Sequence, residues 1–155
     1  MAEDVYIRNE IPDRGRIAII GVMMTVIAFV TPFAYRIDIV PGPNSIRAML
    51  WDYIKASWYS GFRLWNPLDT IPYTLLRMVF AYQIARYYSG KGTKKQAISI
   101  GVASELQPLF VSVPLTYGIQ LPGDPHVPLY IPIPIMLALA ILVLLLVPRL
   151  GHSND

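Results

Sequence analysis

Two opposite charges stand inside long apolar stretches of this chain. Arg77 interrupts a stretch at about 68–88, and Glu105 lies within another at about 97–118. Ionisable side chains in such surroundings are costly and usually lie paired inside a helical bundle. Both residues are fourteen positions from Lys91, so at about 1.5 Å per residue both lie roughly 21 Å from the turn between the stretches. We therefore predict an intramembrane ion pair between Arg77 and Glu105.

Three further polar residues on these stretches extend the pattern. We predict that Gln83, Ser104 and Gln107 form a polar strip beside the ion pair. A buried pair of this kind can fix the register of a helical hairpin. It can also act as a gate or a proton-sensitive switch in a polar pathway. The sequence leaves both interpretations open.

The tryptophans have a helical spacing. Trp51, Trp58 and Trp65 recur every seven residues, with Phe62 beside them, and in a helix they would share one face. Tryptophan favours the membrane interface because its ring is apolar and its N–H needs a polar partner. We predict an interfacial amphipathic helix at about 45–65 that carries this aromatic face. A docking surface for a partner or an amphiphile is the alternative.

The composition indicates the elements that would position these residues. The chain has 155 residues, of which 54% are apolar and 15% charged, against about 25% charged in a typical soluble domain. A helical membrane span needs about 20 apolar residues, and four stretches qualify, at about 17–35, 68–88, 97–118 and 127–147. The predicted fold is an all-α integral membrane protein, a single domain over 1–155 with four transmembrane helices in a bundle.

The basic residues predict an orientation for these spans. The turn at 86–95 carries Arg86, Lys91, Lys94 and Lys95 without an acidic residue, and such loops face the cytoplasm. We therefore predict a multi-pass protein of the cell membrane with cytoplasmic N- and C-termini. The net charge of +3 indicates contact with the lipid bilayer rather than with nucleic acid.

Other chemistry has little support in the sequence. There is no cysteine, and His126 and His152 lie outside the apolar stretches. Because no acidic or histidine cluster has metal-ligand spacing, we predict neither a metal nor a cofactor. No nucleophile motif is present, so the chain is predicted not to be an enzyme. A lipid-active enzyme that uses Asp52, Asp69 or His126 is the catalytic alternative.

Small size and the lack of a catalytic cluster favour an accessory function. We predict a non-catalytic scaffold, or an accessory subunit of a membrane assembly. The alternative is an oligomeric transporter or channel component that uses the Arg77–Glu105 pair. A homo-oligomer or a larger membrane complex is the expected protein partner in either case.

Overall fold

A computed structural model describes residues 14–37, 43–64, 66–117 and 128–148. In these ranges the chain forms four α-helices, one 3₁₀ helix and five β-strands. In chain order they are α1 (Arg14–Val30), β1 (Ala34–Ile37), β2 (Asn44–Arg47), β3 (Trp51–Lys55), β4 (Ser60–Leu64), η1 (Pro67–Thr70), α2 (Ile71–Tyr88), α3 (Lys94–Tyr117), β5 (Leu129–Pro132) and α4 (Ile135–Leu146).

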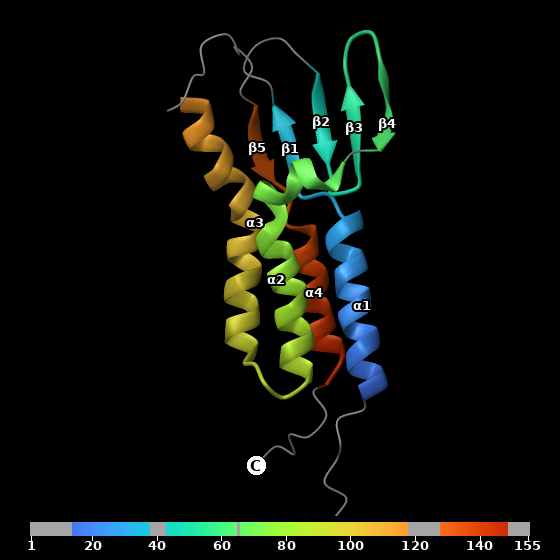
Figure 1. Ribbon diagram of the computed structural model, residues 1–155, viewed down its shortest axis with the longest axis vertical. Helices are drawn as coiled ribbons and strands as arrows, with labels where there is room; N and C mark the ends of the chain where they lie inside the picture. Colours follow the sequence, from blue (N-terminus) through green and yellow to red (C-terminus); the bar gives the residue numbers. More distant parts are fainter. Residues whose placement is uncertain (1–13, 38–42, 65, 118–127, 149–155) are drawn as a thin grey trace, which may run out of the picture.

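The helices run side by side along the long axis, and the sheet stands at one end of them (Figure 1). The turn from α2 to α3 lies at the opposite end, where α1 begins and α4 ends. The chain reverses in that turn at Gly90, whose φ of 85° is a left-handed conformation that glycine adopts without a steric penalty. One end of the molecule is therefore a sheet, and the other is a set of helix ends.

The sheet has the strand order β4-β3-β2-β1-β5, and every neighbouring pair is antiparallel. β1 is the junction, because Ala34 lies opposite Arg47 of β2 on one side and opposite Pro132 of β5 on the other. Pairing with β5 brings the residues before α4 next to those after α1. α1, which precedes β1, and α4, which follows β5, are thus connected to neighbouring strands.

The predicted interfacial helix at about 45–65 was wrong, because this segment forms β2, β3 and β4. Side chains alternate between the two faces of a strand. The polar residues Ser45, Arg47 and Asp52 lie on one face of the sheet, and Ile46 and Tyr53 lie on the other. The local structure of this segment therefore follows the two-residue period of a strand and not the seven-residue spacing of the tryptophans.

The four predicted spans were also wrong. The stretch at 17–35 ends as a helix at Val30 and continues into β1, and the stretch at 127–147 begins with β5 before α4 starts at Ile135. Prolines mark both changes, since Pro32 has no N–H to donate and Pro134 precedes α4. The ranges at 68–88 and 97–118 correspond to η1–α2 and to α3.

No helix in the described ranges combines the length and the apolarity needed to cross a membrane. The fold is a mixed one, with four helices and a five-stranded antiparallel sheet. The all-α membrane bundle, the multi-pass location and the cytoplasmic termini predicted from the spans were therefore wrong. So were the membrane scaffold and the transporter, because both functions were predicted from those spans.

The helical core is built where the four helices meet. Met24 and Ala28 of α1, Phe80 and Ile84 of α2, and Met136 of α4 are all buried there. α3 approaches closely at Gly101, where an added Cβ would lie 2.7 Å from both Phe80 Cζ and Leu137 Cδ1. A glycine at this position lets α3 pack against α2 and α4 at once.

Candidate functional site

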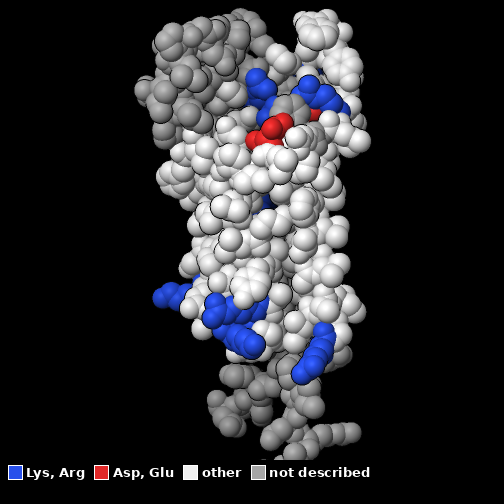
Figure 2. Space-filling model, in the orientation of Figure 1, with Lys and Arg blue, Asp and Glu red and all other residues white. Residues whose placement is uncertain are grey.

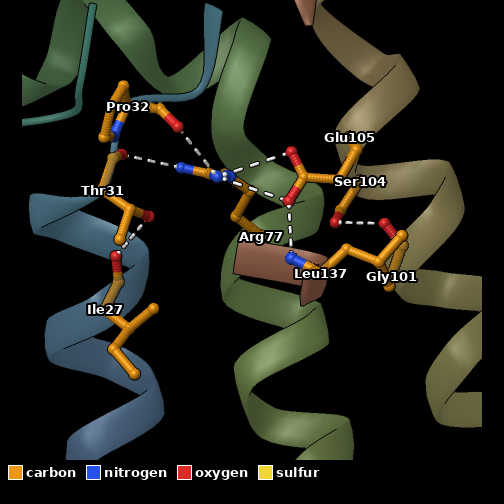
Figure 3. Close-up of polar contacts among 8 residues, drawn as sticks. All are labelled: Ile27, Thr31, Pro32, Arg77, Gly101, Ser104, Glu105 and Leu137. Atoms are coloured by element: carbon orange, nitrogen blue, oxygen red, sulfur yellow. Dashed lines mark hydrogen bonds and ion pairs between the residues drawn. The ribbon is translucent and has the colours of Figure 1, made fainter. Parts of the chain in front are cut away.

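The Arg77–Glu105 pair lies where all four helices come together (Figure 3). Arg77 is fully buried on α2, and its Nη2 is 3.4 Å from Glu105 Oε1 on α3. Nη1 of Arg77 donates to Thr31 O at 3.0 Å, and Nη2 donates to Pro32 O at 3.3 Å. Oε1 of Glu105 accepts from Leu137 N at 3.0 Å. The pair therefore joins α2 and α3 to the end of α1 and the start of α4.

Each charge sits at the helix end that complements it. Thr31 and Pro32 directly follow α1, where free carbonyl groups give the helix terminus a partial negative charge. Leu137 lies in the first turn of α4, where free N–H groups give a partial positive charge. Arg77 and Glu105 therefore neutralise two helix termini as well as each other. Exchanging the two residues would place a carboxylate at the partially negative end of α1 and a guanidinium group at the partially positive start of α4.

Burial acts on both ionisable groups. Desolvation lowers the pKa of Arg77, and the charge of Glu105 opposes that change. Desolvation raises the pKa of Glu105, while Arg77 and the Leu137 N–H act in the opposite direction. Because Arg77 donates to two carbonyl groups besides Glu105, the guanidinium keeps its charge in this site.

The residues of the predicted polar strip do not form one continuous chain of hydrogen bonds. Ser104 donates to Gly101 O at 2.7 Å, and Gln83 is half-buried on α2. Gln107 instead reaches the first turn of α2, where its Oε1 accepts from Leu76 N at 2.8 Å and its Nε2 donates to Pro72 O at 2.7 Å. The side-chain amide of Gln107 thus lies between Leu76 N and Pro72 O, the donor and acceptor of one helical turn of α2. These two hydrogen bonds join α3 to α2.

The aromatic residues are divided between two places. Trp51 packs edge-on against Phe62, with ring centroids 5.5 Å apart, and its Nε1 donates to Val30 O at the end of α1. Trp58 lies between β3 and β4 beside Tyr59 and is 83% exposed. Trp65 lies outside the described residues. The shared helical face expected for these side chains is therefore absent from the described strands.

The three residues considered for catalysis are not brought together in the described ranges. Asp52 is buried in the sheet and accepts from Arg63 Nη2 at 2.9 Å. Asp69 is exposed in η1, and His126 lies outside the described residues. Within the described ranges, no group of three or more His, Cys, Asp and Glu side chains could hold a metal ion.

An apolar groove runs between α1 and α2. Its lower part has a volume of about 530 Å³ and is lined by Ala18, Gly21 and Val22 of α1 together with Ala85 of α2. Its upper part, of about 300 Å³, lies between the end of α1, η1 and the start of α2. Met78 lines both parts, so the two are neighbours along the helices. Each of them is of the size that binds small ligands.

Basic residues gather at the end of the helices where α2 leads into α3, and we call this cluster the basic end. Arg86 closes α2, Lys91 lies in the turn, and Lys94 and Lys95 begin α3. All four are exposed, and no carboxylate of the described residues lies among them. Figure 2 shows Lys and Arg residues at this end and others, together with acidic residues, at the sheet end, with an almost uncharged midsection between them.

The sides of the helices are unusually apolar. Large apolar side chains are at least half exposed on all four helices, among them Ile19, Leu75, Phe110 and Leu145. A monomeric soluble protein rarely exposes a contiguous apolar patch larger than a few hundred Å². The helical surface therefore needs a partner, and the groove is its most concave part.

Sequence reasoning missed the groove, although a signal for it exists. Small residues face each other across the two helices, with Ala18 and Gly21 on α1 and Ala81 and Ala85 on α2. Spacings of three and four place each pair on one helix face. Their short side chains let the two helices approach closely, since a Cβ added at Gly21 would lie 3.5 Å from Ala85 Cβ.

Comparison with protein-family models, with curated proteins and with solved structures finds no match to this chain.

Proposed function

We propose that this protein binds an anionic lipid. The apolar chain of the lipid lies in the groove between α1 and α2, and its negatively charged head meets the basic end. The observation that carries the proposal is the apolar groove of about 530 Å³ between α1 and α2, whose lining includes Ala85, the residue that precedes Arg86 in the chain. The proposed role is binding rather than catalysis.

Charge complementarity favours an anionic lipid over a second protein as the ligand of the groove. An apolar partner would account for the groove but not for four basic residues gathered at one end of the helices. An amphiphile with an anionic head accounts for the groove and for these basic residues. Basic residues near an anionic lipid surface each contribute about 1 kcal/mol to binding, so the cluster adds substantially to burial of the chain.

Vesicle binding tests the electrostatic half of the proposal. The protein is sedimented with vesicles of phosphatidylcholine alone, or of phosphatidylcholine mixed equally with phosphatidylglycerol. We expect binding only to the anionic vesicles. The triple variant Lys91→Gln, Lys94→Gln, Lys95→Gln should bind about 100-fold more weakly at low salt, from about 1 kcal/mol per charge. A matched triple variant with arginine at the same positions should bind like the wild type.

A second pair of variants tests the groove. Ala18 is exposed and lines the groove, so Ala18→Phe should block it and weaken binding of monomeric oleate. Ala103 is exposed on α3 outside the groove, so Ala103→Phe is the matched control and should leave binding unchanged. Oleate binding without vesicle binding would identify a free fatty acid as the ligand source, and vesicle binding would identify a membrane lipid.

Two results would overturn the proposal. Equal binding to neutral and anionic vesicles by the wild type would remove the role of the basic end. A lipid-free dimer that Ala18→Phe dissociates would show that a second copy of the chain covers the groove instead.

A further inference from the structure

The upper part of the groove between α1 and α2 offers a ligand no polar group of the described residues. Its volume is about 300 Å³, and it is lined by apolar side chains of α1, η1, α2 and the turn after β2, among them Met49, Leu68 and Leu75. Thr74 is the one polar side chain of this lining, and it is fully buried with its hydroxyl donating to Thr70 O at 2.8 Å. The upper part therefore accepts hydrocarbon and disfavours any group that must keep its hydrogen bonds to water.

The lower part of the groove has a different lining, because it includes exposed side chains with hydroxyl groups. Thr25 and Tyr82 lie there beside the apolar residues. The same lining includes Ala85, and Arg86 of the basic end follows it in the chain. From the basic end towards the sheet, the surface thus changes from charged to mixed and then to purely apolar. An anionic amphiphile has the same order of groups from its head to the end of its chain.

The two parts of the groove meet at Met78. Its side chain is half-buried and lines both parts, and an unbranched methionine side chain adapts its shape more readily than a branched one. On α2, the positions from Met78 to Ala85 and from Ile71 to Met78 each span roughly 10 Å, at about 1.5 Å per residue. A short chain that starts at the basic end therefore fits within the lower part, whereas a long one must pass Met78.

We propose that the upper part holds the methyl end of the lipid chain, so that the ligand is an anionic lipid with a long chain and no polar group at its far end. This inference rests on the proposed function, because the basic end decides which end of the lipid points towards the sheet. The Met78 side chain moves aside when a long chain enters the upper part. Octanoate lies within the lower part, and the chain of palmitate reaches the upper one.

Calorimetric titration of the full chain with saturated fatty acids from octanoate to palmitate, each kept monomeric, tests the proposal. The affinity should rise about fourfold for each added methylene, the gain expected from burying one CH₂ group. Hexadecanedioate has the chain of palmitate with a second carboxylate at its far end, and it should bind no more tightly than octanoate. An affinity that levels off beyond decanoate, or equal affinity for hexadecanedioate and palmitate, would overturn the proposal.

A matched pair of variants locates the methyl end in the upper part. Leu75 is 55% exposed and lines the upper part, so Leu75→Trp should weaken palmitate binding about tenfold or more, as if two methylenes were expelled. The same variant should bind octanoate like the wild type, which also shows that it is folded. Leu142 is 50% exposed on α4 and lines neither part, so Leu142→Trp is the control and should bind both fatty acids like the wild type. An equal loss for octanoate and palmitate in Leu75→Trp would contradict the proposal.

The same titrations separate this inference from the proposed function. Ala18→Phe blocks the lower part of the groove and should weaken the binding of octanoate and palmitate alike. If neither fatty acid bound and anionic vesicles were not preferred, the proposed function and this inference would both be refuted. If palmitate bound and Ala18→Phe weakened it, but the affinity did not depend on chain length, only the assignment of the methyl end to the upper part would be refuted.

Discussion

Replacing Arg77 with methionine removes the charge from the junction of the four helices. Methionine fills much of the volume of the arginine stem, so packing changes little. The variant leaves the Glu105 carboxylate with Leu137 N as its remaining hydrogen-bond partner among the described residues, and the carbonyl groups of Thr31 and Pro32 lose their donors. Because the side chain of Glu105 is only 5% exposed, solvent replaces little of what is lost.

The expected destabilisation at neutral pH is about 3–5 kcal/mol, the cost of leaving one member of a buried ion pair without its partner. For a chain of this length, each kcal/mol lowers the melting temperature by about 2–4 °C, so the transition should fall by roughly 6–20 °C. The loss should shrink as the pH falls through the raised pKa of Glu105, because protonation removes the unpaired charge.

Urea unfolding followed by far-UV circular dichroism measures this change, with all variants in the same buffer. Arg86→Met is the matched control, because Arg86 is an exposed arginine on the same helix. Its loss should cost no more than about 1 kcal/mol, the contribution of a cation at a helix C-terminus. If Arg77→Met cost as little as Arg86→Met, the pair would not stabilise the helix junction and the reasoning would be refuted.

Three further predictions follow from the same geometry. The double exchange Arg77→Glu with Glu105→Arg should be no more stable than either single change, since it places like charges at the ends of α1 and α4; recovery of the wild-type melting temperature would contradict this. Gly101→Ala should lower the free energy of unfolding by about 1–3 kcal/mol through overpacking against Phe80 and Leu137, whereas Ala103→Gly, on the exposed side of α3, should cost about 1 kcal/mol or less; equal losses would exclude the close contact. Burial raises the pKa of Glu105, so between the ordinary and the raised pKa the native state holds a proton that the unfolded chain has lost. The stability of the wild type relative to Glu105→Gln should therefore fall as the pH rises from the ordinary glutamate pKa through the raised one. A relative stability that rose with pH would show that the pKa of Glu105 is lowered instead.

The sequence indicated the helical hairpin and the depth of its charges. Arg77 and Glu105 are equally distant from Lys91 along two helices with the same rise per residue, so both lie at one level of the bundle. Nothing in this spacing shows that the pair also reaches the ends of α1 and α4. Those contacts depend on where α1 ends and α4 begins, which is decided by the pairing of β1 with β5, whose partner residues are 92–98 positions apart in the sequence.

The sheet was missed because competing patterns were read with the wrong period. Tryptophans seven residues apart suggest a helix, yet Ile46 stands between Ser45 and Arg47, and Asp52 stands between Trp51 and Tyr53, which is the alternation of a strand. The turns at 48–50 and 56–59 hide the alternation by shifting its phase. β1 and β5 were hidden differently, since both are short apolar continuations of apolar helices, and hydropathy alone cannot separate a helix from a buried strand.

The electrostatics of the basic end come from side chains rather than from helix dipoles. α1 and α3 begin at this end, and α2 and α4 finish there. Two partially positive helix termini therefore face two partially negative ones, and their fields largely cancel. The positive potential available to an anionic lipid head must then come from the exposed lysines and arginines. Their neutralisation should abolish the preference for anionic vesicles, and about 0.15 M salt should weaken that preference because exposed charges are screened over about 8 Å. A preference that survived both changes would require an anion site made of backbone N–H groups, which this antiparallel arrangement of helix ends does not favour.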